Sequence, residues 1–333
     1  MLEGRIYAIM EKRVPKRSFS MIQTVTGSIA KEEIGRALIH EHISCASNDM
    51  IRAFGKRWLD ENKLIDRALK IVNAMKDRYG LDTIVDGTPI DLGRNAGVLK
   101  RLSELSGVKI IASSGLYHYP SFVTLTNSEK TMAQWFLDEI ENGLDGTSVK
   151  PGILKCATDN LGISAENEKR IGALGRVQKE SGLPLYLHTL HQEGTLKKAL
   201  GILLDRGADP EKIIVGHLDD KCDFEYASNI IKLGCYVTFD RRQITPDYTE
   251  KVAKTLVRLF DGGYGDRLLV SNDCCIYSDF CLPGNKWVKP EDIQNTMGYA
   301  LDELKGEFLK QGGGENEYNE MITKNVQNAL DVK

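Results

Sequence analysis

Eight short apolar runs alternate with longer segments of helical periodicity between residues 38 and 274, and this alternation limits the possible folds more than any other feature. The runs are rich in Ile, Val and Leu without strict apolar–polar alternation, which is typical of parallel strands buried on both faces. We therefore predict strands at 38–43, 83–88, 109–117, 152–159, 184–189, 212–219, 235–240 and 267–274.

The segments between the runs carry apolar residues at the spacing of one helix face, with charged residues between them. Ser164 is a suitable N-cap for a helix at 165–181, and Gly182 is a suitable stop. The same periodicity predicts helices at 61–78, 195–206, 250–260, 291–309 and about 316–331.

Alternating strands and helices imply a parallel sheet with right-handed crossovers. A doubly wound open sheet would also fit this alternation. Eight units, with no Gly-X-Gly-X-X-Gly turn after the first strand, favour a closed (β/α)8 TIM barrel, whose functional site lies at the C-terminal ends of the strands. We expect one α/β domain over residues 22–333, preceded by an N-terminal extension at 1–21.

Composition excludes several classes of function. The 333 residues carry a net charge of −3, which leaves no basic surface for nucleic acid. No apolar stretch approaches the length of a membrane span, and the basic N-terminal residues lack the apolar core of a secretory signal. The seven cysteines are odd in number and lack zinc-finger spacing, so we expect reduced thiols in a cytoplasmic protein.

Four of the six histidines lie at predicted strand ends. His40 and His42 form a His-X-His step, whose side chains leave the same face of a strand, as two ligands of one metal must. An isolated step of this kind would be read as two ordinary polar residues. His188 ends the fifth predicted strand and His217 ends the sixth, which favours a metal site instead.

Two further residues lie at strand ends with the chemistry of metal ligands. Lys155 lies in the fourth predicted strand, and Asp273 ends the eighth. A lysine that extends its amine from the barrel end into solvent is the alternative for Lys155. We expect all these side chains to converge, because the C-terminal ends of parallel barrel strands surround one mouth.

The ordered set resembles the phosphotriesterase family of the amidohydrolase superfamily over about residues 22–332. The resemblance implies two divalent metal ions, zinc first and manganese or cobalt as alternatives. It also implies that carbon dioxide converts Lys155 to a carbamate that bridges both ions. The ligands implied for the more buried ion are His40, His42 and Asp273, and those for the more exposed ion are His188 and His217.

The carbamate is chemically reasonable at this position. A protonated Lys155 would be repelled by two dications, whereas a carbamate is an anion with one oxygen for each ion. The reaction implied by the resemblance is attack by a metal-bridging hydroxide on a carbonyl or phosphoryl centre. Asp273 would accept the proton and pass it to the leaving group.

Three positions bear on the substrate. Tyr117 ends the third predicted strand, and its hydroxyl could reach the rim of the site; an aromatic core residue is the alternative. Arg241 directly follows the seventh predicted strand, where phosphotriesterases tend to have His, and an arginine at this point resembles the family's lactonases. Asp219 shares a face with His217 and could anchor Arg241 or the substrate. We therefore expect a polar or anionic small-molecule substrate.

The leading hypothesis is a binuclear metal hydrolase that opens a lactone, which could be a sugar lactone carrying phosphate. The second is a phosphotriesterase or phosphoester hydrolase with the same metals. The third is a non-catalytic binding protein on the same barrel, which would have no need of Lys155 or Asp273. A homodimer is expected from the resemblance, with no nucleic-acid or membrane partner.

Overall fold

The structure is a computed structural model, and it describes residues 21–158, 162–191, 194–243, 245, 247–280 and 297–332. The predicted N-terminal extension, except its last residue, and the start of the helix predicted at 291–309 lie outside the described residues. Within the described part, no helix is long and apolar enough to cross a membrane.

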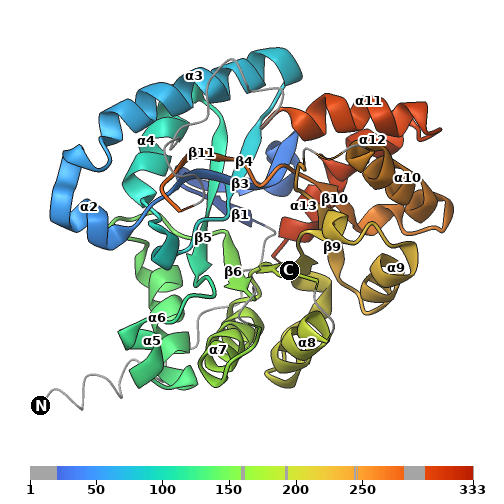
Figure 1. The fold of residues 1–333 in the computed structure, drawn as a ribbon. Coiled ribbons are helices and arrows are strands. Elements are labelled where there is room, and N and C mark those ends of the chain that lie inside the picture. Colours follow the sequence, from blue (N-terminus) through green and yellow to red (C-terminus); the bar gives the residue numbers. More distant parts are fainter. Residues whose placement is uncertain are drawn as a thin grey trace, which may run out of the picture.

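Parallel strands form at all eight predicted positions and pair in chain order (Figure 1). Every neighbouring pair in this sheet is parallel, as the non-alternating apolar runs predicted. The strands are β3 (Ala37–Cys45), β4 (Thr83–Asp86), β5 (Lys109–Gly115), β6 (Ile153–Ala157), β7 (Leu185–His188), β8 (Ile213–Val215), β9 (Tyr236–Phe239) and β10 (Leu268–Val270).

The last strand comes in two pieces, and its second piece lies beside the first strand. After β10 the chain leaves the strand conformation at Asp273, where φ is 51°. It then continues as β11 (Cys275–Ser278), which pairs in parallel with β3. The Asp273 amide donates to the His40 carbonyl at 3.0 Å, and the His42 amide donates to the Cys274 carbonyl at 2.9 Å. The fold is therefore the predicted α/β TIM barrel.

Helices surround the strands on the outside (Figure 1). Ser164 caps α7 by accepting from the Asn167 amide, and Gly182 ends that helix in the left-handed conformation, as predicted. The helices predicted at 61–78, 195–206 and 250–260 also begin and end within two residues of the predicted positions. The helices that follow strands are α3 (Glu61–Tyr79), α4 (Ala96–Ser106), α6 (Glu129–Asn142), α7 (Ala165–Ser181), α8 (Thr195–Asp205), α9 (Phe224–Lys232) and α10 (Tyr248–Asp261).

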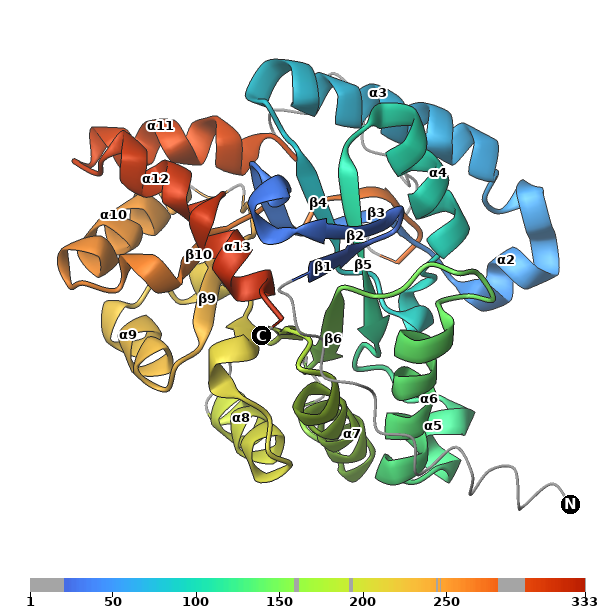
Figure 2. The same cartoon turned by 180° about the vertical axis from the view of Figure 1, so that it is seen from behind.

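The C-terminal helices are shorter than predicted. In the described part of 291–309, the α-helix is confined to α11 (Glu303–Lys310), which follows a 3₁₀ turn. The helix predicted at 316–331 is two helices, α12 (Glu315–Met321) and α13 (Lys324–Leu330), because the chain turns at Ile322 and Thr323. A hairpin of β1 (Met21–Thr24) and β2 (Gly27–Ala30), which the sequence did not predict, lies with α13 across the barrel seen from behind (Figure 2).

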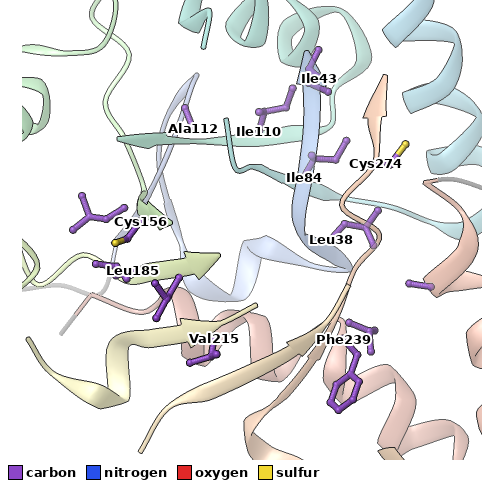
Figure 3. Packing of buried hydrophobic residues seen from close by; sticks show 14 of the residues in the cluster. Leu38, Ile43, Ile84, Ile110, Ala112, Cys156, Leu185, Val215, Phe239 and Cys274 are labelled. Carbon is purple, nitrogen blue, oxygen red and sulfur yellow. The ribbon is translucent and has the colours of Figure 1, made fainter. Parts of the chain in front are cut away.

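The strands separate two apolar cores, which explains why their sequences are continuously apolar. Leu38, Ile84 and Ile110 point outward to the helices (Figure 3). Their chain neighbours Ile39, Val85 and Ile111 point into the barrel, where Ile22 of β1 joins them. Burial of each such side chain contributes about 1.5–3 kcal/mol. The interior of the barrel is thus packed, and polar side chains gather beyond it at the C-terminal ends of the strands.

Candidate metal centre

His40 and His42 both lie in β3 and are buried. Each uses Nδ1 for a hydrogen bond, His40 with Asp240 Oδ2 at 3.0 Å and His42 with Thr88 Oγ1 at 2.8 Å. Their Nε2 atoms both face Asp273 Oδ1, at 3.6 Å from His40 and 3.1 Å from His42. Fixing Nδ1 in this way orients an imidazole so that Nε2 can bind a metal.

Lys155 reaches the same point from β6 and is also buried. Its Nζ lies 2.6 Å from His40 Nε2 and 4.2 Å from the centroid of the Tyr186 ring. Burial lowers the pKa of Lys155 to about 8. A side chain that extends into solvent, the alternative considered from the sequence, would not be buried in this way. Gly87 gives this cluster its space, because a Cβ there would lie 2.6 Å from His40 Cδ2.

His188 and His217 make a second pair across the mouth of the barrel. His188 ends β7, and its Nδ1 lies 2.7 Å from His217 Nε2. His217 follows β8 in the left-handed conformation, with φ of 64°. The Tyr117 hydroxyl lies 3.0 Å from His188 Nε2. The structure therefore places Tyr117 against a predicted ligand rather than in the apolar core.

Asp240 links the two pairs, and sequence reasoning missed it. It is fully buried, and its Oδ1 lies 2.8 Å from His217 Nδ1 while Oδ2 accepts from Tyr186 and faces His40. Burial alone would raise the pKa of Asp240, but the imidazoles of His217 and His40 hold it below its ordinary value. The available signal was its position as the last residue of the predicted strand 235–240.

Asp273 lies beyond β10 and faces His40, His42 and Arg241. Its Oδ2 is 3.7 Å from Arg241 Nε. Burial would raise the pKa of Asp273, but the neighbouring imidazoles hold it well below its usual range. The carboxylate is therefore ionised near neutral pH, as a metal ligand or a proton acceptor must be.

Glu41, between the two histidines of the motif, supports the segment that carries Asp273. Its buried carboxylate accepts from Ser271 Oγ at 2.7 Å, from the Asn272 amide at 2.9 Å and from the Cys274 amide at 3.0 Å. Because side chains alternate along a strand, Glu41 faces away from the side that presents His40 and His42. Sequence reasoning assigned Glu41 no role.

Arg241 and Asp219 lie beside one another. Asp219 Oδ2 accepts from the Arg241 amide at 2.5 Å and from the Tyr248 hydroxyl at 2.8 Å. The Arg241 guanidinium pairs with Asp220 at 2.7 Å. The positive charge of Arg241 is therefore partly balanced by acidic side chains of the protein.

The donor atoms converge closely enough for a cation. The ligand atoms of His40, His42 and Asp273 all lie within 4.8 Å of one another, and those of His40, His217 and Asp240 do likewise. Imidazole nitrogens with a carboxylate oxygen are a common zinc ligand set, so the residues present fit a metal. Asp240 already accepts hydrogen bonds with both oxygens, which favours an orienting role over ligation.

The family model that describes phosphotriesterases matches residues 20–328, which is nearly the whole chain. The chain belongs to the phosphotriesterase family. Similar proteins include an aryldialkylphosphatase of Saccharolobus solfataricus, 30% identical over 289 residues that cover 86% of this chain and 91% of the relative. A phosphotriesterase homology protein of Mycobacterium tuberculosis is 29% identical over 272 residues, covering 78% and 82% of the two chains.

A relative with a differently named activity is also similar to this chain. An N-acetyltaurine hydrolase of Mus musculus is 28% identical over 291 residues, covering 76% of this chain and 83% of the relative. The named activities differ in the bond that is cleaved, but each is a hydrolysis. This protein is thus a hydrolase of the phosphotriesterase family that acts on small molecules, with histidine and aspartate clusters able to bind metal.

Proposed function

We propose that this hydrolase opens a polar lactone, which could be a phosphorylated sugar lactone, at a centre of two divalent ions. The observation that carries the proposal is the meeting of His40, Lys155 and Asp273 around one buried point, with 2.6 Å between Lys155 Nζ and His40 Nε2. A carbamate formed on this buried amine would stand beside the imidazole and carboxylate that are the proposed ligands of one ion.

The proposed ligands follow from the placement of the side chains. We propose that the ions are zinc, with manganese or cobalt as alternatives, and that Lys155 would contribute to the binding of both. The other ligands would be His40, His42 and Asp273 for one ion and His188 and His217 for the other. When bound, two dications would supply a nucleophilic hydroxide near neutral pH and polarise the oxygen of the scissile bond.

Lys155 would bridge the ions as a carbamate. Its neutral amine would attack carbon dioxide, form an N–C bond and release one proton, which leaves an anion with two oxygens. Burial supports this step, because it lowers the pKa of Lys155 to about 8 and so increases the fraction of neutral amine near neutral pH.

Asp273 would accept the proton of the attacking water and transfer it to the ring oxygen that leaves. Its depressed pKa keeps it ionised and able to accept. Tyr117 would orient the substrate, since its hydroxyl lies 3.0 Å from His188 Nε2. Arg241 lies 3.7 Å from Asp273 and would donate hydrogen bonds to a polar substituent next to the scissile bond.

The relative named aryldialkylphosphatase favours a phosphotriester as the second candidate substrate. Both reactions place negative charge on an oxygen at the same point, so one site can catalyse both to different extents. The ion pair of Arg241 with Asp220 makes one side of the site charged, which suits a polar lactone better than an aryl phosphotriester.

The test is a substrate screen on enzyme loaded with zinc, manganese or cobalt. It would include lactones with and without phosphate, an aryl phosphotriester and an N-acyl amide, with Asp273→Asn as the matched control. We expect the highest kcat/KM for a phosphorylated lactone. A higher value for the phosphotriester or the amide would contradict the lactone assignment. A two-metal protein inert to all of them would favour the binding-protein hypothesis.

We also propose a homodimer in the cytoplasm. Large apolar side chains on and beside α5 (Phe122–Thr126) support self-association, with Phe122 80% exposed and Leu125 57% exposed. All six cysteines among the described residues are free thiols, which agrees with a reducing compartment. Sedimentation equilibrium would give the mass of the assembly, and a monomer at micromolar concentration would contradict the dimer.

A further inference from the structure

Two cysteines from neighbouring strands meet beside the candidate metal centre. Cys45 ends β3 and Cys275 begins β11, and their sulfur atoms are 3.6 Å apart. Cys45 is 5% exposed, whereas Cys275 is partly exposed. The adjacent Cys274 belongs instead to the outer apolar core and packs toward the helices. Neither thiol has a role in the proposed hydrolysis.

The pair lies on the same two strands as two proposed metal ligands. Cys275 is paired in register with His42 and follows Asp273 by two residues. The His42 amide donates to the Cys274 carbonyl, and the Asp279 amide donates to the Cys45 carbonyl, so backbone hydrogen bonds flank the thiols on both sides. A change in the sulfur–sulfur separation must therefore act on the strands that carry the contact between His42 and Asp273.

We propose that Cys45 and Cys275 are a redox-active pair that a peroxide oxidises to a disulfide. One sulfur of the pair attacks hydrogen peroxide, which gives a sulfenic acid and one water. The other sulfur then displaces hydroxide from that sulfenic acid, which forms the S–S bond and a second water. In sum the two thiols lose two electrons and two protons, and one peroxide becomes two waters.

Bond formation requires the two sulfurs to approach. A disulfide is about 2.05 Å long, so the sulfurs must close by about 1.5 Å from their present 3.6 Å. The thiols are three residues out of register on their strands, because Cys45 pairs with Ser278 and Cys275 with His42. Side-chain rotation alone is thus insufficient, and the backbone of β3 or β11 must shift.

The functional consequence rests on the proposed function. A shift of β3 against β11 separates or rotates His42 and Asp273, whose Nε2 and Oδ1 atoms now lie 3.1 Å apart. Loss of outer support for metal ligands typically costs 10- to 100-fold in metal affinity or activity. Oxidation is therefore expected to release metal and lower hydrolysis by about tenfold or more, and a thiol reductant is expected to restore both after metal is added back.

The experiment treats the metal-loaded full chain with hydrogen peroxide, stops the reaction with catalase, and maps disulfides in unreduced peptides. Free thiols and released metal are counted in the same samples. Wild type is compared with Cys275→Ala, with Cys45→Ser as a second disruption of the pair, and with Cys274→Ala as the matched control. We expect a Cys45–Cys275 bond, loss of two thiols and metal release in wild type and Cys274→Ala, and none of these in the other two variants.

Several results would overturn the proposal. These are the absence of a Cys45–Cys275 bond after oxidation, a different pairing, or equal metal release in Cys275→Ala and wild type. A mapped disulfide without metal release would remove the proposed effect on the site. A mapped disulfide in a protein inert to every substrate tested would contradict the hydrolytic proposal and leave the redox pair intact.

Discussion

Replacement of Asp240 by asparagine is the sharpest test of how the centre is organised. Oδ1 of this buried carboxylate accepts from the His217 amide at 3.1 Å and faces His217 Nδ1, while Oδ2 faces His40 Nδ1 and accepts from Tyr186. An asparagine has one oxygen and one NH₂ group. In either orientation, the NH₂ group would face Nδ1 of His40 or of His217, so one of the two imidazoles loses its acceptor.

The magnitude follows from that loss. Removal of the partner that orients a metal-binding imidazole typically costs 10- to 100-fold in metal affinity. Because each orientation of the asparagine leaves one of the two histidines supported, we expect the cost for a single ligand, which is about 1.4–2.7 kcal/mol. Loss of the buried negative charge acts in the same direction, since a nearby anion favours a bound cation.

The assay is competition between the apoprotein and a chromophoric chelator for zinc, with circular dichroism to verify folding. Asp266→Asn is the matched control, because Asp266 is an exposed carboxyl in the turn before β10. Thr88→Val provides a second comparison, since it removes the partner of His42 Nδ1 and a longer bond of 3.4 Å to the Ser44 carbonyl, while both imidazoles keep Asp240 or Asp273. A folded Asp240→Asn protein with zinc affinity within about twofold of wild type would refute the reasoning.

Other substitutions test the remaining parts of the site and the partly buried carboxyl of Asp91. Lys155→Ala is expected to lose metal and hydrolysis together, with partial rescue by short carboxylic acids; full activity would exclude a bridging role. Asp273→Asn is expected to fold normally while kcat falls by about 10²- to 10⁴-fold, and an unchanged kcat would exclude it as the proton acceptor. Gly87→Ala is expected to weaken metal binding, because its Cβ would lie 2.6 Å from His40 Cδ2; wild-type affinity in a chelator titration would contradict that clash. Burial raises the pKa of Asp91 to about 6, above the value of about 3.9 in an unfolded chain. Its contribution to the free energy of unfolding therefore falls as the pH rises between these values, so urea unfolding of Asp91→Asn is expected to show a smaller decrease over that range than wild type.

The barrel could be predicted because its strands bury both faces. Leu38 packs toward the helices while Ile39 packs inside, and the same division holds for Ile84 and Val85. This arrangement leaves a continuous apolar run in the sequence. The interruption between β10 and β11 left no such mark, since it depends on the backbone of Asp273 and on contacts with β3.

The candidate ligands were visible in the sequence because each stands at or just beyond an apolar run. Asp240 also ends such a run, but aspartate is common where a strand meets a loop, and nothing local distinguished it. Its partners His40 and His217 are 200 and 23 residues away in the chain. Glu41 shows the same limit, because its partners are about 230 residues away and become neighbours only when the barrel closes.

The carboxyl groups of Asp240 and Glu41 also stabilise backbone conformations that are unfavourable by themselves. His217 and Asp273 have φ of 64° and 51°, a region in which a residue with a side chain costs about 1–3 kcal/mol. Asp240 accepts from the His217 amide, and Glu41 accepts from the amides on both sides of Asp273. Each strained residue is thus held by a buried carboxyl group that accepts from backbone next to it. The imidazoles keep the pKa of Asp240 low, whereas burial raises the pKa of Glu41 to about 8. The strain turns these two side chains into the mouth of the barrel, where a regular strand would continue past it, so the carboxylates that hold the backbone also determine where the candidate ligands point.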